Sequence, residues 1–297
     1  MAANTDVHIW EKLMTDPIMV GVDGSGRSLR ALVWAAHEAA LRHRALRIIH
    51  VLPLFHSYAT NEAERIGERN EWDQGVATEA TAIVREAHPD LEVTSALPSG
   101  NPAAVLLAEA EHAHTVVLGA KGMGSFGSLL IGSVATQVVG HAASPVVIVN
   151  HVPTGHGRIV VGADGSAYSR AALAYAFEQA SLRGAPLHAL HAWSHPGPHA
   201  HVSAAQDALA KEQRQTLEEW LAPLRHEYPE VKVVEQLPDE PPVIALSRAS
   251  DRADLLVVGS RGLGGFHGLA LGSVSHHLLQ FSQCPLAVIA HGPEVPT

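Results

Sequence analysis

The 297-residue chain contains a single cysteine, Cys284, which excludes an internal disulfide bond and favours a reducing, cytoplasmic location. No apolar run reaches the roughly 18 residues that a membrane-spanning helix needs. The first residues lack the basic and apolar segments of a secretion signal. The net charge of −10 argues against a surface that binds nucleic acid. These absences indicate a protein without a membrane or nucleic-acid partner.

The chain consists of two similar halves. Residues 18–23 (IMVGVD) match residues 159–164 (IVVGAD). The aspartate that ends each segment begins an Asp-Gly-Ser sequence, at 23–25 and at 164–166. Residues rich in Gly, Pro and His separate the halves and are typical of a linker. We therefore expect a flexible tail over 1–16, a first domain over 17–150, a linker over 151–157 and a second domain over 158–292.

Each half alternates apolar segments, typical of buried strands, with Ala- and Leu-rich helical segments. Ser28 and Ser169 are the expected N-caps of the first helix of each half. This alternation predicts an α/β fold with a parallel sheet, which binds ligands at the carboxyl ends of its strands. The expected strands are 18–23, 46–52, 91–97, 115–119 and 145–150, then 159–164, 187–193, 231–237, 254–259 and 285–290. The expected helices are 28–43, 61–88, 102–112 and one from Ser133, then 169–183, 203–226, 241–250 and one from Ser273.

A glycine-rich loop follows the fourth expected strand of each half. Residues 119–133 (GAKGMGSFGSLLIGS) and 259–273 (GSRGLGGFHGLALGS) share the pattern Gly, two residues, Gly, nine residues, Gly-Ser. The first two glycines of each loop are expected to let the backbone turn sharply and approach a ligand. Gly-Ser then opens a helix, whose free N–H groups and dipole suit phosphate oxygens. Lys121 and Arg261 occupy matching positions and could add positive charge.

Two other phosphate-binding motifs are excluded, and one structural alternative stays open. Residues 122–127 (GMGSFG) fit G-x-G-x-x-G, but they do not follow the first strand, and His267 breaks the pattern in the second half. The P-loop pattern does not occur in the sequence. The glycines could instead serve tight turns and helix packing, and Asp23 and Asp164 could form N-caps or Asx-turns.

Together these residues resemble the universal stress protein family in its tandem-domain form, from about Ile18 to Ala290. The loop pattern is that of the family's ATP-binding branch, so the resemblance implies two five-stranded, Rossmann-like α/β domains that each bind ATP. It places Asp23 and Asp164 by the adenosine, the backbone of Val51 and Ala192 at the adenine, and the loop glycines and serines at ribose and phosphates. The expected ATP-binding residues of the first half are Gly21, Val22, Asp23, Val51, Gly119, Lys121, Gly122, Gly132, Ser133 and Val134. Those of the second half are Gly162, Ala163, Asp164, Ala192, Gly259, Arg261, Gly262, Gly272, Ser273 and Val274.

The resemblance implies a nucleotide-responsive regulator of a stress response or of growth, with ATP as cofactor and Mg²⁺ as a possible companion ion. It also implies a homodimer joined through the fifth strands, while the regulatory partner is unidentified. The loops hold no acidic residue that could position an attacking water, so we expect at most slow ATP hydrolysis and assign no catalytic residue. A slow ATPase or nucleotide-dependent transferase, and a chaperone-like stress protein without catalysis, remain the alternatives.

A few further residues carry weaker expectations. Ala192, in place of Val51, gives the second adenine wall less bulk, and Glu240-Pro241-Pro242 replaces Gly100-Asn101-Pro102, so that loop must turn differently. His195, His199 and His201 could ligate Zn²⁺ or Ni²⁺, but a solvated loop without a metal is the favoured interpretation. The repeated pair His50 and His191 and the lone Cys284 are expected to be buried core residues. The charged segment 61–73 is expected to be a solvated helix face.

Overall fold

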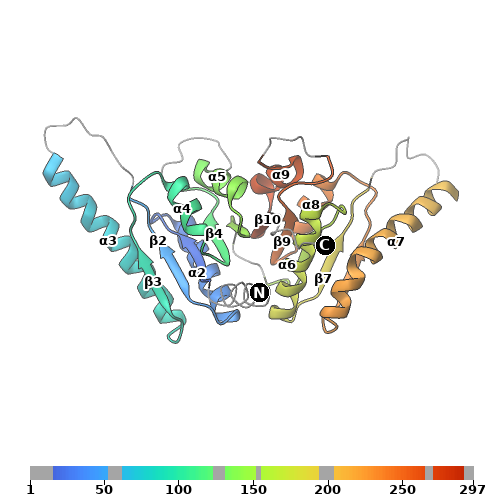
Figure 1. Cartoon of the computed structure of the whole chain (residues 1–297), viewed down its shortest axis with the longest axis horizontal. Coiled ribbons are helices and arrows are strands. Elements are labelled where there is room, and N and C mark those ends of the chain that lie inside the picture. The colour runs from blue at the N-terminus through green and yellow to red at the C-terminus, as the bar shows by residue number, and fades with distance from the viewer. Residues whose placement is uncertain are drawn as a thin grey trace, which may run out of the picture. The chain divides into compact units, whose positions relative to one another are not determined.

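Figure 1 shows the chain as a computed structural model, which describes residues 16–52, 62–122, 131–151, 155–193, 204–264 and 270–290. The chain divides into two compact units, Met1–Val149 and Asn150–Thr297. In each unit the described residues form five parallel strands that alternate with helices. The α/β class and the tandem repetition expected from the sequence are confirmed.

The two units carry the same succession of elements. The first contains β1 (Ile18–Gly21), α2 (Gly26–Leu41), β2 (Leu46–Ile49), α3 (Glu62–Ala87), β3 (Val93–Ala96), α4 (Pro102–Ala110), β4 (Thr115–Gly119), α5 (Ser133–His141) and β5 (Val146–Val149). The second contains β6 (Ile159–Gly162), α6 (Ala167–Arg183), β7 (Leu187–Leu190), α7 (Ala204–Glu227), β8 (Val233–Gln236), α8 (Pro242–Ser250), β9 (Leu255–Gly259), α9 (Ser273–Phe281) and β10 (Leu286–Ile289).

The strand order creates a switch point in each unit. The strands of the first unit lie in the order β3-β2-β1-β4-β5, and those of the second in the order β8-β7-β6-β9-β10. Ile18 of β1 pairs with Leu46 of β2 on one side and with Thr115 of β4 on the other. The connections therefore run in opposite directions from β1, and a crevice opens between the carboxyl ends of β1 and β4. The same crevice is expected between β6 and β9, which pair in parallel.

The core explains why the strands are apolar throughout rather than alternating. Ile18, Met19 and Val20 are consecutive in β1, and all three are 0% exposed. Since successive side chains of a strand point to opposite faces, both faces of the sheet must be covered. Helix α2 packs on β1 and β4 and against α3, whereas α4 packs against α5. Continuous apolar runs are the sequence signature of such doubly covered sheets.

The expected N-caps of the first helices were wrong by one helical turn. Helix α2 begins at Gly26 with Ser25 as its N-cap, and the Ser25 side chain accepts a hydrogen bond from the Ser28 N–H. Ser166 caps α6 in the same way, bonded by the Ser169 N–H. Ser28 and Ser169 thus donate backbone N–H groups to the caps, because each helix starts before its apolar segment.

The first two strands of each unit are shorter than the sequence indicated. The first strand was expected to run through Asp23, but β1 ends at Gly21 and β6 ends at Gly162. Gly24 (φ +78°) and Gly165 (φ +82°) then adopt a backbone conformation that L side chains rarely take. The second strands are also short, because β2 ends at Ile49 and β7 ends at Leu190. The Asp-Gly-Ser segments are therefore turns that place each aspartate beyond its strand.

The turns before the third helices differ between the units, as expected. Gly100 has φ +154°, and the Asn101 side chain caps α4 by accepting from the N–H groups of Ala103 and Ala104. In the second unit Pro241 precedes α8 without a side-chain cap, and Glu240 instead forms an ion pair with Arg248. The second turn is thus built from a charge pair in place of a glycine and a capping amide.

Several remaining expectations concern single residues. Cys284 is 1% exposed, as expected for an inert core thiol.

None of the helices that the structure describes is long and apolar enough to cross a membrane. The histidines at 195, 199 and 201 lie outside the described residues. Within the described ranges, no group of three metal-ligating side chains comes together.

Candidate functional site

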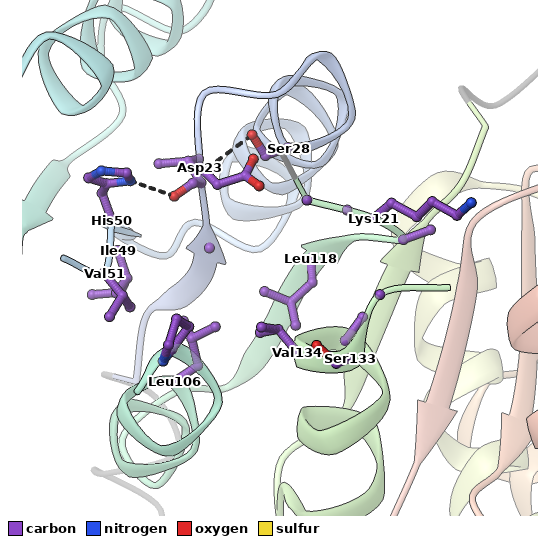
Figure 2. Close-up of a pocket in the computed structure, with 18 of the residues that line it drawn as sticks. Asp23, Ser28, Ile49, His50, Val51, Leu106, Leu118, Lys121, Ser133 and Val134 are labelled. Atoms are coloured by element: carbon purple, nitrogen blue, oxygen red, sulfur yellow. Dashed lines mark hydrogen bonds between the residues drawn. The ribbon is translucent and has the colours of Figure 1, made fainter. Parts of the chain in front are cut away.

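A cavity of about 540 Å³ lies at the switch point of the first unit. The ends of β1, β2 and β4 and the start of α5 surround it, and Figure 2 shows Asp23, Val51, Leu118 and Val134 around the space. Every site residue expected in the first half lines this cavity: Gly21, Val22, Asp23, Val51, Gly119, Lys121, Gly122, Gly132, Ser133 and Val134. Residues spread over more than a hundred positions of sequence are therefore brought together.

The second unit has a smaller cavity, of about 260 Å³, at the corresponding place. The residues expected in the second half line it: Gly162, Ala163, Asp164, Ala192, Gly259, Arg261, Gly262, Gly272, Ser273 and Val274. Small-molecule sites usually measure about 300–1,000 Å³. The first cavity lies within that range, and the second lies just below it.

The aspartate beyond the first strand forms an Asx-turn in both units. Asp23 Oδ1 accepts a hydrogen bond from the Ser25 N–H at 3.0 Å, and Asp164 Oδ1 accepts one from the Ser166 N–H at 3.0 Å. Both aspartates therefore form the Asx-turns that were considered as an alternative to a role in ligand binding. Because each carboxylate also lines its cavity, the turn fixes the acidic group at the edge of the space.

The second glycine of each loop lies directly against that aspartate. A Cβ added at Gly122 would collide with Asp23 Oδ2, and one added at Gly262 would collide with Asp164 Oδ2. In the second unit, Asp164 Oδ2 also accepts a hydrogen bond from the Leu263 N–H at 3.1 Å. The glycine thus permits contact between the loop and the Asx-turn, and it does not simply leave room for a ligand.

The first glycine of each loop has the helix-packing role that the sequence left open as an alternative. A Cβ at Gly119 would lie 3.0 Å from the backbone carbonyl carbon and oxygen of Arg27, and one at Gly259 would lie 2.8 Å from Tyr168 C. Gly119 and Gly259 are not among the glycines with a positive φ, and the chain bends at the two residues that follow each of them. Glycine is needed here because the first helix approaches the end of the fourth strand closely.

The start of α5 presents donors to the cavity. Gly132 is the N-cap residue, Ser133 is exposed at the first helical position, and the Thr136 N–H makes the first helical bond, to the Gly132 carbonyl at 3.1 Å. The N–H groups that precede Thr136 have no acceptor within the helix. Gly272 and Ser273 repeat the arrangement at α9. These ends combine backbone donors, a hydroxyl and a helix dipole, which together favour an anion.

The two loop cations are placed differently. Figure 2 shows the Lys121 side chain directed away from Asp23 and Leu118. Arg261 lies with its guanidinium carbon 5.7 Å from the centre of the Tyr168 ring, and it donates to the Tyr168 hydroxyl at 3.3 Å. Both residues line their cavities through part of their length. Lys121 would therefore bring its charge to a ligand only after its side chain turns, whereas Arg261 is fixed by its contact with Tyr168.

The backbone after the second strand offers a donor and an acceptor. The neighbours of Val51 are committed to the sheet edge: the His50 N–H bonds to the Ala96 carbonyl at 3.0 Å, and the Leu52 N–H to the Pro98 carbonyl at 2.9 Å. Within the described residues, no hydrogen bond involves the Val51 N–H or carbonyl. An N–H and a C=O side by side can pair with a planar heterocycle that carries a matching acceptor and donor.

A buried histidine–aspartate pair borders the first cavity. His50 Nδ1 lies 2.9 Å from the Val22 carbonyl, which can only accept, so Nδ1 carries a proton and donates it (Figure 2). His50 Nε2 lies 2.8 Å from Asp73 Oδ1, and both side chains are 4% exposed. Because a second proton must lie between these two atoms, the pair is either an imidazolium and a carboxylate or two neutral groups.

The sequence interpretation of this region was right for the histidines and wrong for one residue of the helix. His50 and His191 are buried and hydrogen-bonded, as expected. The segment 61–73 was expected to be a solvated face, but Asp73 is only 3% exposed and lines the cavity. A carboxylate that follows a tryptophan was the available signal, and it was hidden among the other charges of the segment.

The second unit replaces this carboxylate with an amide. His191 Nδ1 donates to the Ala163 carbonyl at 2.8 Å, and His191 Nε2 lies 2.8 Å from the Gln213 side-chain amide. An amide can donate or accept and carries no charge. The first unit thus holds an ionisable carboxyl group beside its cavity, whereas the second satisfies the same imidazole with an amide that cannot ionise.

A model of the universal stress protein family matches residues 14–150 and again residues 155–290. The chain belongs to the universal stress protein family. Its glycine loops and the aspartates beyond the first strands therefore sit in two copies of the family's domain. The tandem form recognised from the repeated sequence is confirmed.

Relatives of this universal stress protein match it along nearly the whole length. A universal stress protein of Mycobacterium tuberculosis is 35% identical over 94% of this chain and 97% of the relative. One from Mycolicibacterium smegmatis is 34% identical over 92% of this chain and 96% of the relative. The crystal structure of a universal stress protein from Archaeoglobus fulgidus superposes with a TM-score of 0.71 at 23% identity, covering 94% of this chain and 98% of that one. The last comparison supports the fold.

Proposed function

We propose that each unit binds an adenine nucleotide, ATP, and that occupancy of these sites regulates a stress response or growth. The observation that carries the proposal is the gathering of three features around one cavity in each unit. These are the aspartate of the Asx-turn, the two loop glycines and the N-terminus of the helix that follows the loop. This combination suits a ligand with an anionic end and a polar, planar end.

The residues of the first cavity fit such a ligand. The phosphates would lie at the start of α5, where the Ser133 hydroxyl and the helical N–H groups can donate to them. The adenine would lie at the other end, against the Val51 N–H and carbonyl, with Asp23 near the ribose. A Mg²⁺ ion bound with ATP would take its ligands mostly from phosphate oxygens and water.

The distribution of acidic groups favours binding over catalysis. The carboxylates that line the first cavity, Asp23 and Asp73, come from the turn after β1 and from α3, whereas the described lining residues at the start of α5 are uncharged. A base that orients water at the terminal phosphate is therefore lacking from the described lining, and we expect slow turnover at most. Regulation would then follow from a difference in ATP affinity between two conformations or two partner-bound states.

The proposal also concerns assembly and location. We propose a homodimer that is joined through the fifth strands, β5 and β10, and that is located in the cytoplasm.

Titration calorimetry of the purified chain with ATP tests the proposal directly. Binding should be lost at the first site in Ser133→Asp and at the second in Ser273→Asp. Both residues are exposed at the first position of a helix, where an added carboxylate stabilises the helix but repels phosphate. If the wild-type chain takes up no ATP and its melting temperature does not rise with ATP, the proposal is wrong. Phosphate release of several turnovers per minute that Ser133→Asp abolishes would favour the ATPase alternative.

A further inference from the structure

The two cavities differ most at the side next to the long helix. In the first unit the cavity extends to α3, where Trp72, Asp73 and His50 form part of its wall. In the second unit neither His191 nor any residue described in α7 lines the cavity. The difference between about 540 Å³ and about 260 Å³ therefore coincides with a wall that the described residues form in the first unit and not in the second.

Trp72 is the large apolar side chain of this wall. It is 41% exposed, although it lies beside a cavity and close to the Asx-turn. Its ring centre lies 5.8 Å from that of His50 in an edge-on arrangement, and a Cβ at Gly24 would lie 3.0 Å from the indole. His50 is in turn fixed by the Val22 carbonyl and Asp73. The indole is therefore held in place on one side and left open on another.

The second unit uses its tryptophan differently. Trp220 packs edge-on against His191 at 5.1 Å, and a Cβ at Gly165 would collide with its indole. It lies seven residues after Gln213, the amide that contacts His191, whereas Trp72 directly precedes Asp73. Trp220 is half-buried and does not line the second cavity. Both units thus have an edge-on contact between a tryptophan and the buried histidine. In the second unit, however, the tryptophan packs against neighbouring residues and does not line the cavity.

We infer that Trp72, held by the His50–Asp73 pair, is a nucleoside-recognising wall that makes the first site much tighter for ATP than the second. This inference rests on the proposed function and goes beyond it, because it assigns a specificity residue and predicts two unequal classes of site. Both sites share the helix N-terminus that would receive the phosphates. The wall on α3 is the largest difference at the nucleoside end, larger than the exchange of Val51 for Ala192, and we assign the selectivity to it.

The expected size of the effect follows from the stacking of bases on aromatic side chains. Removal of an aromatic partner weakens nucleic-acid binding by about 1–3 kcal/mol per base, which corresponds to a factor of roughly 5 to 150 in Kd. The first site should thus bind ATP roughly 5 to 150 times more tightly than the second. Inorganic tripolyphosphate lacks the nucleoside, so its affinity should differ little between the sites.

The test isolates each site in the full-length chain and adds one change to the wall. Ser273→Asp blocks the second site, so that only the first can bind ATP, and Ser133→Asp blocks the first, so that only the second can. ATP is titrated into each variant by calorimetry. In the Ser273→Asp background, Trp72→Ala should raise the Kd for ATP about 5- to 150-fold while leaving that for tripolyphosphate within twofold, and Trp72→Phe should restore most of the affinity. Val33→Ala, which removes another exposed apolar group of the same unit, is the matched control and should leave both constants unchanged.

The outcomes separate this inference from the proposed function. Equal ATP affinities in the two single-site variants, or an unchanged ATP affinity in Trp72→Ala with an unchanged melting curve, would overturn the wall assignment while ATP binding itself stands. An equal loss of ATP and tripolyphosphate affinity in Trp72→Ala would also overturn it, because the indole would then act on the whole site. Failure of the wild-type chain to bind ATP would refute both proposals together.

Discussion

Replacement of Gly262 by alanine tests the contact between the glycine loop and the Asx-turn in the second unit. An added Cβ would collide with Asp164 Oδ2, the oxygen that accepts from the Leu263 N–H at 3.1 Å. The other oxygen, Oδ1, accepts from the Ser166 N–H at 3.0 Å. Since both oxygens are engaged, the carboxylate cannot move away from the new methyl group without losing a hydrogen bond.

The magnitude of the effect can be worked out from these contacts. A hydrogen bond to a charged group contributes about 1.5–3 kcal/mol. Alanine restricts the unfolded chain and offsets about 0.4–1 kcal/mol of that loss, because Gly262 does not need a positive φ. We therefore expect Gly262→Ala to lower the free energy of unfolding of the second unit by about 1–2 kcal/mol. For a domain of this size, the melting temperature should fall by roughly 2–8 °C.

Differential scanning calorimetry of the full chain measures this change, and two further variants identify its cause. Gly264→Ala is the matched control, because a Cβ at Gly264 has no neighbour within 4 Å, and its melting temperature should stay within about 2 °C of wild type. In an Asp164→Ala background the collision is removed, so Gly262→Ala should cost almost nothing. If Gly262→Ala lowers the melting temperature equally with and without Asp164, the reasoning is refuted.

Three further outcomes are expected. Burial raises the pKa of the Cys284 thiol to about 12, so iodoacetamide at pH 8 should label the denatured chain rapidly and the folded chain hardly at all; rapid labelling of the folded chain would contradict this. Asp73→Ala removes one partner of a buried pair and should cost the first unit about 3–5 kcal/mol in urea unfolding, whereas Gln213→Ala should cost the second about 1–3 kcal/mol; equal losses would argue against a charged pair. Ser166→Ala should lower the stability of the second unit by about 1 kcal/mol through loss of the α6 cap, and an unchanged melting curve would show that the cap is dispensable.

The sequence was sufficient for the elements and for the loop and turn residues around each cavity, but not for Trp72 and Asp73. Apolar runs, helical spacing and turn residues are local signals, so the α/β alternation could be predicted although strand ends were misplaced by two or three residues. Parallel strands bring their carboxyl ends to one edge, which is why the loop after β4 and the turn after β1 could be expected to meet. The error at Ser28 has the same origin, because the cap depends on where the helix begins rather than on where its apolar face begins.

What the sequence by itself determined is a repeated α/β chain with a phosphate-binding type of loop after the fourth strand of each half. Only the tertiary structure decided how the halves differ. Trp72 lines the first cavity and Trp220 does not line the second, although each packs edge-on against a buried histidine and lies against the glycine of an Asx-turn. Such contacts join residues far apart in sequence, so no local pattern specifies which side chains of each long helix line a cavity.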